Sequence, residues 1–167
     1  MSFKQRPRLF HYKIFHRLLN VNEYLFKCNL ENSDLCPFCP GKESIVHALC
    51  DCPFNNNFIQ KCTEWLDKLT KTNFAINNTE FIFGIINENY DKHINLYNRF
   101  YFLVKFFIWE SRKEKRPPSL VEFLKFLYEE VRYEVDYLSS KFSNSQNILQ
   151  DRWLEILDIS DILNRYK

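Results

Sequence analysis

The sequence predicts a mainly α-helical protein: a helical domain with a small cysteine-rich insert near its N-terminus. Glycine occurs twice in 167 residues, against about twelve at average usage. This scarcity disfavours a hairpin-rich sheet and excludes Gly-rich phosphate-binding loops. Apolar residues recur at three- and four-residue steps along most of the chain, which is the period of a helix. The 17 Phe and 9 Tyr, within a 46% hydrophobic composition, predict a large aromatic core and exclude a disordered polar tail.

The N-terminal part begins with a predicted basic amphipathic helix over about residues 8–19. Its predicted core positions are Leu9, Ile14, Leu18 and Leu19. Asn22 is then expected to cap a short helical turn through residues 24–26. Residues 29–53 show no regular period and hold four of the six cysteines. They form the predicted insert.

The middle of the chain contains the predicted central helix. A first helix is expected over residues 54–69, where apolar side chains recur at helical steps. A short apolar run at residues 81–86 contains Gly84 and is compatible with either a helix or an extended segment. From His93 to about Glu114 the apolar residues occupy every face. A helix that is apolar all round is a buried one.

Two further helices are predicted after a Pro-Pro pair. Ser119 and Glu122 have the spacing of a capping box, which starts a helix through about Leu138. Its apolar face comprises Leu120, Phe123, Leu124, Leu127, Val131 and Val135. The last helix carries Leu149, Trp153, Ile156, Leu157, Ile162 and Leu163. The three tryptophans all lie in apolar patterns, which favours core packing over base stacking.

Charge is unevenly distributed although the net charge is only +2. Residues 1–28 carry six Lys/Arg against one Glu, and residues 105–116 carry five against two acidic residues. Residues 117–167 carry six basic and nine acidic side chains. A basic front and an acidic back indicate an oriented anionic partner such as a phosphate backbone, while a merely solvated basic face is the alternative.

No membrane segment is expected. The most hydrophobic stretch, residues 100–109, is interrupted by Lys105 and is too short to span a bilayer. The basic N-terminus lacks the apolar core of a signal peptide. The predicted location is therefore intracellular, either nuclear or cytoplasmic.

The cysteines and one histidine have the spacing of a metal site. Cys36 and Cys39 form a Cys-x2-Cys pair, and His47 and Cys52 follow five residues apart. Such a pair directs two thiolates at one ion, and an imidazole with a third thiolate completes a tetrahedron. Zn²⁺ suits this ligand set, and four protein ligands make the site structural. Cys50, three residues after His47, is the rival for the fourth position.

The remaining cysteines are expected to be small buried hydrophobes, because Cys28 and Cys62 lie on apolar helical faces. Without an internal repeat or a linker, the chain is predicted to be one domain over residues 1–167. The zinc-binding segment then lies at about residues 29–65 and a helical tail at about residues 78–167.

The run FHRLLNVNEYLFKCNLENSDLCPFCPGKESIVHALCDCPFNNNFIQKCTEWL resembles the zinc-binding region downstream of the polymerase in non-LTR (LINE-type) retrotransposon reverse transcriptases. The positions that carry the resemblance are Arg17, Asn22, Leu25, Cys36, Cys39, Glu43 with Ser44, His47, Cys52 and Trp65. A later stretch, FIFGI…LVKFFIWESRKEKRPPSLVEFLKFL, resembles the helical tail of such elements, where a Lys, an aromatic-Ile-Trp, an Arg and a Pro recur. The resemblance covers about residues 10–130.

The catalytic motifs of those elements are missing here. The chain contains no Asp-Asp pair for a polymerase and no Pro-Asp for the associated nuclease. The sequence therefore predicts no enzyme, and the chain resembles a fragment of a retroelement, a degenerate copy or a recruited descendant.

The function predicted from charge and resemblance is a zinc-binding module that holds RNA or DNA, mostly through phosphates. The predicted contacts are Lys4, Arg6, Arg8, Lys13 and Arg17 in the first helix and Arg112, Lys113, Lys115 and Arg116 in the later turn. The polymerase portion of a parent retroelement protein is a further expected partner. The alternative is a zinc-stabilised structural or protein-interaction module.

Overall fold

The structure, a computed structural model, describes residues 5–86, 92–142 and 153. This part of the chain is mainly helical, as predicted, and contains no strand beyond one antiparallel bridge between Leu35 and Lys42. Its helices are α1 (Gln5–Phe15), α2 (Asn22–Lys27), a π-helical turn η1 (His47–Asp51), α3 (Pro53–Thr70), α4 (Asn78–Phe83), α5 (Lys92–Lys113) and α6 (Leu120–Lys141).

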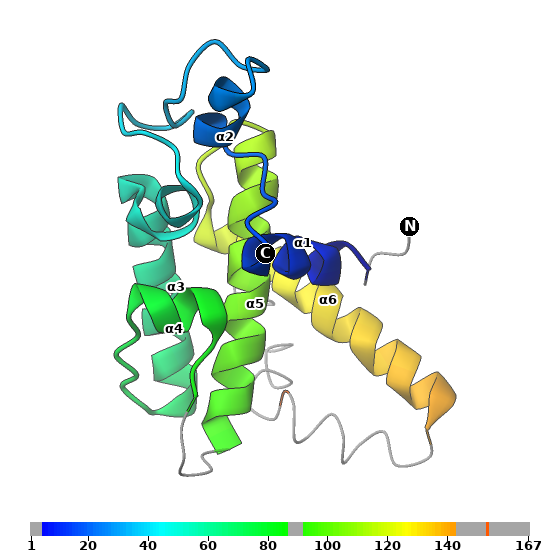
Figure 1. The fold of residues 1–167 in the computed structure, drawn as a ribbon. Coiled ribbons are helices and arrows are strands. Elements are labelled where there is room, and N and C mark those ends of the chain that lie inside the picture. Colours follow the sequence, from blue (N-terminus) through cyan, green and yellow to red (C-terminus); the bar gives the residue numbers. More distant parts are fainter. Residues whose placement is uncertain (1–4, 87–91, 143–152, 154–167) are drawn as a thin grey trace.

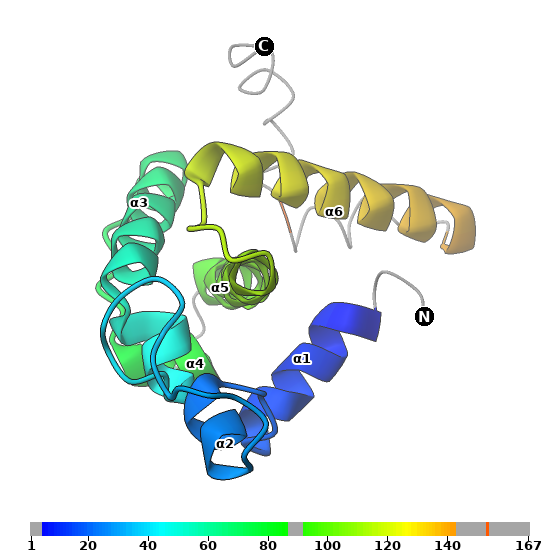
Figure 2. The ribbon, with the colours of Figure 1, turned by 90° about the horizontal axis from the view of Figure 1, so that it is seen from above.

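Helix α5 is the centre of the fold. Seen along its axis, it is surrounded by α3, α4, α1 and α6 (Figure 2), and it contacts each of them as well as η1. Its most deeply buried side chains are Tyr97, Phe100, Tyr101, Val104 and Ile108. The prediction of a central buried helix is confirmed, because a helix covered on every side needs apolar residues on every face.

Aromatic rings hold this core together. Phe100 stacks on Trp65 of α3, with ring centroids 5.8 Å apart. Phe123 of α6 meets Phe58, Phe100 and Phe107 with its ring nearly perpendicular or steeply inclined to theirs. Edge-to-face pairs of this kind add to the energy of burial. Helices α3, α5 and α6 are thereby joined through one shared cluster.

Helix α4 includes residues 81–83 of the ambiguous run, and residues 84–86 lie beyond its end. The Asn77 side chain accepts a hydrogen bond from the backbone amide of Glu80 at 3.0 Å, and the Glu80 carboxylate accepts from the amide of Asn77 at 3.1 Å. This reciprocal pair is a capping box. Gly84 ends the helix at a φ of 102°, a conformation that favours glycine.

The first helix differs from its prediction in length and in buried face. Helix α1 ends at Phe15, and Arg17 then takes a left-handed conformation with φ of 55°. Leu18 is 53% exposed because it lies beyond the helix, and Leu9 is exposed on the outer face. Ile14 and Leu19 are buried as predicted, and Phe10, which is not among the predicted core positions, is buried beside them.

Of the two predicted caps, Asn22 is wrong, and Ser119 has the predicted position without the predicted hydrogen bonds. Asn22 is the first residue of α2 and not its cap, and its side chain is used in tertiary hydrogen bonds. Ser119 occupies the N-cap position of α6 but makes no capping hydrogen bond. Glu122, its expected partner, binds Arg116 at 3.2 Å instead. In both cases a tertiary or neighbouring charged partner competes with the local pattern.

The other predictions concern cysteines and tryptophans, and most of them are confirmed. Cys62 is buried as expected, but Cys28 is exposed because it lies just after the end of α2. Trp109 is buried. Trp153 is also buried, and its indole N–H donates to Glu134 at 2.9 Å. The rest of the predicted last helix lies outside the described residues.

Among the described helices, none combines the length and the hydropathy that crossing a membrane requires.

Candidate metal centre

The Cys-x2-Cys pair lies in a tight loop beside the start of α3 and α2 (Figure 1). The bridge between Leu35 and Lys42 closes this loop, and the amide of Cys36 donates to the carbonyl of Gly41 at 2.8 Å. The amide of Phe38 points at the Cys36 sulfur, 3.5 Å away. Backbone hydrogen bonds therefore close the loop that carries both thiols.

The other two candidate ligands are brought together by the π-helical turn. The amide of Cys52 donates to the carbonyl of His47 at 3.0 Å, across five residues. One turn of a π-helix is wider than one turn of an α-helix, so residues five apart lie on the same side. The spacing of five between His47 and Cys52 thus matches the local backbone.

The four ligand atoms of Cys36, Cys39, His47 and Cys52 all lie within 4.8 Å of one another. The Cys36 and Cys52 sulfurs are 3.9 Å apart, and the Cys39 sulfur is 3.2 Å from Nε2 of His47. A tetrahedral zinc site has edges of about 3.8 Å between thiolates and about 3.5 Å from thiolate to imidazole. The arrangement therefore fits a four-coordinate metal, as the sequence predicted for these four residues.

Burial favours the neutral, protonated form of two of these thiols. Burial raises the pKa of the Cys36 thiol to about 12 and also raises the pKa of Cys52. The backbone amides of Phe54 and Asn55, at the start of α3, act in the opposite direction on Cys52. A metal ion binds the thiolate form, so its binding releases protons. The positive charge of the ion then offsets the negative charge of the clustered thiolates.

Gly41 makes room for the imidazole. A Cβ at this position would stand 2.8 Å from Cε1 of His47 and 3.5 Å from the Cys39 sulfur. The 2.8 Å separation from His47 is shorter than a normal contact, so a larger residue would displace the imidazole. The backbone of the loop and the ligand ring are therefore in direct contact.

Cys50 is not part of the cluster. It is 98% buried and faces the charge of Lys105 in the core. Burial raises the pKa of its thiol to about 12. Because Cys52 and not Cys50 joins the other three ligand atoms, the choice between the two rivals agrees with the prediction.

A buried ion pair connects the metal-binding loop to α5. Glu43 is fully buried, and Arg112 binds its two carboxylate oxygens at 2.6 and 2.5 Å. Asn22 contacts both residues. Its backbone N–H donates to the Glu43 carboxylate at 2.7 Å, and its side-chain oxygen accepts from Arg112 at 3.0 Å. We call this the Asn22–Glu43–Arg112 network. Both carboxylate oxygens of Glu43 thus accept hydrogen bonds, as a buried charge requires.

This network changes the interpretation of the predicted phosphate contacts in the later turn. Arg112 is committed to Glu43, Lys113 pairs with Glu110, and Arg116 pairs with Glu114 and Glu122. Of the four cations predicted in this turn, Lys115 alone forms no ion pair with a described residue. Sequence reasoning missed the role of Arg112, since its partner lies 69 positions away and no local pattern links the two.

The cations of the predicted first helix, of which Arg17 lies just beyond the end of α1, have different surroundings. Arg6, Arg8 and Arg17 are exposed and Lys13 is half-buried. Among the residues that the structure describes, none of the four forms an ion pair with a carboxylate. Lys4 lies outside the described residues. The positive charge of α1 is thus available to an external anion, in contrast to that of the turn.

Comparisons with family models, curated proteins and solved structures find no match to this chain. The metal-binding geometry and the distribution of charge are therefore the observations on which a function rests.

Proposed function

We propose that the protein is a zinc-stabilised module that binds RNA or DNA through the phosphates contacted by α1. The observation that carries this proposal is the pairing of two features in neighbouring elements. A Cys₃His cluster holds the loop that follows α2, and the cations of α1 have no carboxylate partners in the described structure.

The metal we propose is Zn²⁺, in a structural role. Three thiolates and one imidazole are a ligand set that zinc favours, and four protein ligands leave no position for a reacting water. The site would then hold the loop in place against α5 through the Asn22–Glu43–Arg112 network. Metal analysis of the purified protein tests this, with one zinc per chain expected.

In this proposal charge holds the nucleic acid, through phosphate contacts that do not themselves read its sequence. Arg6, Arg8, Lys13 and Arg17 would contact phosphates, which position a strand but carry no sequence information. The turn at residues 112–116 contributes less than its charge suggests, because its arginines already have partners. In keeping with the resemblance, the polymerase portion of a parent retroelement protein is a second proposed partner.

The test is a salt titration of binding to single- and double-stranded probes. Phosphate contacts release counterions, so affinity should fall steeply with salt. Replacing Arg8, Lys13 and Arg17 together by Ala should reduce the slope by about three, one for each contact. The matched control replaces Lys27, Lys68 and Lys125, which are equally cationic and exposed on other helices, and should retain the wild-type slope.

The alternative is a protein-interaction module. It is favoured by apolar side chains exposed around the metal-binding loop, including Leu30, Leu35 and Phe54. Binding that does not depend on salt, or a slope unchanged in the triple Ala variant, would support this alternative over the proposal.

Catalysis is not part of the proposed function. Polymerases and the associated nucleases place metal ions on paired carboxylates, and the sequence lacks the corresponding Asp-Asp and Pro-Asp motifs. Primer extension on an RNA template with Mg²⁺ or Mn²⁺ should therefore give no product with this chain alone.

A further inference from the structure

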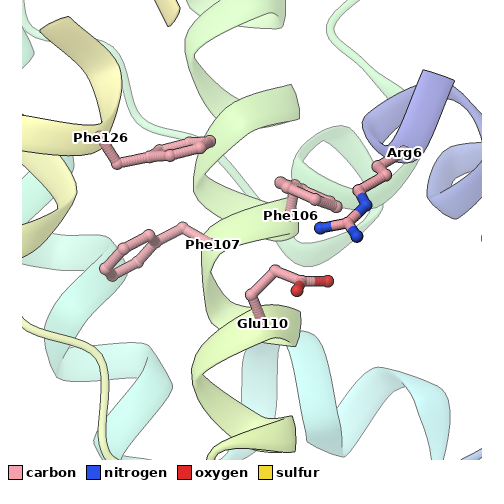
Figure 3. Close-up of a pocket in the computed structure, with 5 residues that line it drawn as sticks. All are labelled: Arg6, Phe106, Phe107, Glu110 and Phe126. Carbon is pink, nitrogen blue, oxygen red and sulfur yellow. The ribbon is translucent and has the colours of Figure 1, made fainter. Parts of the chain in front are cut away.

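An aromatic pocket lies between three helices, at the end of α1 that carries Arg6. Its volume is about 180 Å³. It is lined by Arg6 of α1, Phe106, Phe107 and Glu110 of α5, and Phe126 of α6. Figure 3 shows Phe107 and Phe126 on one side and Phe106 beside Arg6 and Glu110 on the other. None of these residues belongs to the metal centre.

The size and walls of the pocket suit one planar ring. A cavity of about 150 Å³ lined by apolar side chains is known to hold benzene. The ring of Phe126 lies 6.1 Å from that of Phe106 and 5.7 Å from that of Phe107, inclined by 36° and 34°. Phe107 and Phe126 are only half-buried, so aromatic surface remains for a further ring to contact.

The polar groups of the pocket are complementary to the edge of a base. Arg6 is exposed and donates only, while Glu110 accepts only. One carboxylate oxygen of Glu110 is bound by Lys113 at 2.5 Å, and the other oxygen has no hydrogen bond in the described structure. A purely apolar side chain would use neither group. A nucleobase uses both, since its edge carries acceptors and donors side by side.

We propose that this pocket receives one unpaired base of a single-stranded nucleic acid. The base would contact the rings of Phe107 and Phe126, with Arg6 donating to its acceptors and Glu110 accepting from its N–H groups. Unstacked bases are commonly held in this way, by aromatic contact and hydrogen bonds to their edges. Guanine is the preferred base, because it offers O6 and N7 to an arginine and N–H donors to a carboxylate.

The inference rests on the proposed function and adds to it. Arg6 belongs both to the pocket and to the cations of α1, so a strand following α1 would pass the opening. Phosphate contacts alone would bind single and double strands with little distinction between them. The pocket predicts a preference for single strands, because a base inside a duplex is not free to enter it.

The experiment uses the full chain and a strand of twelve thymidines in which one central base is either guanine, 2-aminopurine or thymine. Binding should be about five-fold or more tighter with guanine than with thymine alone, the lower part of the range for discrimination by one bidentate pair to a base edge. The fluorescence of 2-aminopurine should change as the base leaves its neighbours. Phe126→Leu, which keeps an apolar side chain but removes the ring, should abolish both effects while leaving the salt slope unchanged.

Two matched controls separate the pocket from its surroundings. Tyr128→Leu removes an exposed aromatic ring from the same helix, outside the pocket, and should behave as wild type. Glu110→Gln should reduce the preference for guanine, whereas Glu129→Gln, at an exposed position of α6, should not.

The possible failures are distinguishable. Strong binding without a guanine preference or a fluorescence change would overturn the pocket and leave the proposed function intact. No binding of any strand would overturn both. If the strand binds without a fluorescence change while benzene shifts the NMR signals of Phe126, the pocket is a site for an apolar side chain and the inference is wrong.

Discussion

The metal-binding segment, residues 34–52, and the helical body, made of α1, α3, α5 and α6, are held together by different means. The segment contains one β-bridge, a single π-helical turn and four clustered ligands. The body is packed through aromatic rings around α5. A short irregular segment cannot bury enough apolar surface to be stable alone, so in our proposal a metal stabilises the segment and the aromatic core stabilises the body.

The two regions meet at the Asn22–Glu43–Arg112 network. Glu43 belongs to the segment and Arg112 to the end of α5, and the guanidinium also lies 4.8 Å from the ring of Trp109. The segment is therefore attached to the body by a charge pair as well as by chain connectivity. Perturbing the metal, the core or the pair should affect the two regions unequally.

Removing the metal should have the largest effect, confined to the segment. Structural zinc contributes about 10–16 kcal/mol of apparent binding free energy in small fingers. Chelation of the purified protein, or Cys36→Ser, should speed amide hydrogen exchange in residues 34–52 by orders of magnitude. The exchange of α5 and the helical circular dichroism should change little.

The control for metal removal is Cys50→Ser, which alters a buried thiol outside the cluster and should retain the metal. If Cys50→Ser loses the metal while Cys52→Ser keeps it, the ligand set is wrong. If chelation unfolds the whole chain, the body depends on the segment and the two regions are not separable.

Truncating a core ring should have the reverse effect. Phe100 is fully buried and packs against both Trp65 and Phe123. Phe100→Ala should lower the free energy of unfolding by about 3–5 kcal/mol, from lost burial and the cavity left behind. Urea denaturation measures this loss, and the folded variant should still bind one metal ion per chain.

Breaking the connection between the regions should have a smaller effect, felt by both. Glu43→Gln leaves the Arg112 guanidinium buried without its counter-charge, and such a loss costs about 3–5 kcal/mol when burial is complete. We expect about 3 kcal/mol in urea denaturation, since the Arg112 side chain keeps 13% of its exposure. Metal affinity should fall as well, because Glu43 positions the loop.

A double variant checks the origin of that loss. Glu43→Gln with Arg112→Met removes both charges, and it should recover part of the stability lost in Glu43→Gln alone. If the free energy of unfolding lost in the double variant equals the sum of the losses in the two single variants, the two residues act independently.

Local patterns predicted the body and the ligands, and long-range contacts account for most of what they missed. The helical period of α5 depends only on neighbouring residues, and the metal ligands lie within one short segment. The partnership of Glu43 with Arg112 joins distant positions, so spacing could not indicate it. The same contact explains why Asn22 does not cap α2: its side chain binds Leu35 and Arg112 instead.

The errors at α1 have a different origin. Its apolar residues outnumber the positions that face α5, because Leu9 and Leu18 fit the helical pattern as well as Phe10 and Ile14 do. The left-handed conformation of Arg17 stops the helix early, and neither glycine nor proline marks that point in the sequence. Charge likewise predicted two basic clusters, but only the structure shows that one of them is largely neutralised by neighbours.

Mild acid should weaken the body through His11, independently of the metal. The imidazole of His11 stacks on the ring of Phe102, with centroids 3.9 Å apart, and Nε2 lies 3.4 Å from the carbonyl oxygen of Phe102. Burial, together with the charge of Lys105, lowers the pKa of His11 to about 3. Between pH 6.5 and 3 the unfolded chain therefore binds a proton that the folded chain does not.

Since the unfolded state takes up more protons in that window, the free energy of unfolding falls as the pH is lowered. The contribution of His11 is a loss of about 2 kcal/mol between pH 7 and pH 5. His11→Phe preserves the stacking on Phe102 but cannot be protonated, so its stability should fall by about 2 kcal/mol less than that of the wild type over this range. Acid also releases a metal from its ligands, but that loss is common to both proteins and cancels in the comparison. His16→Phe makes the same chemical change at an exposed position of the same N-terminal region. If burial of the imidazole causes the acid sensitivity, this variant should lose stability in acid as the wild type does. Equal acid sensitivity of wild type and His11→Phe would assign the whole pH dependence to the metal-binding segment.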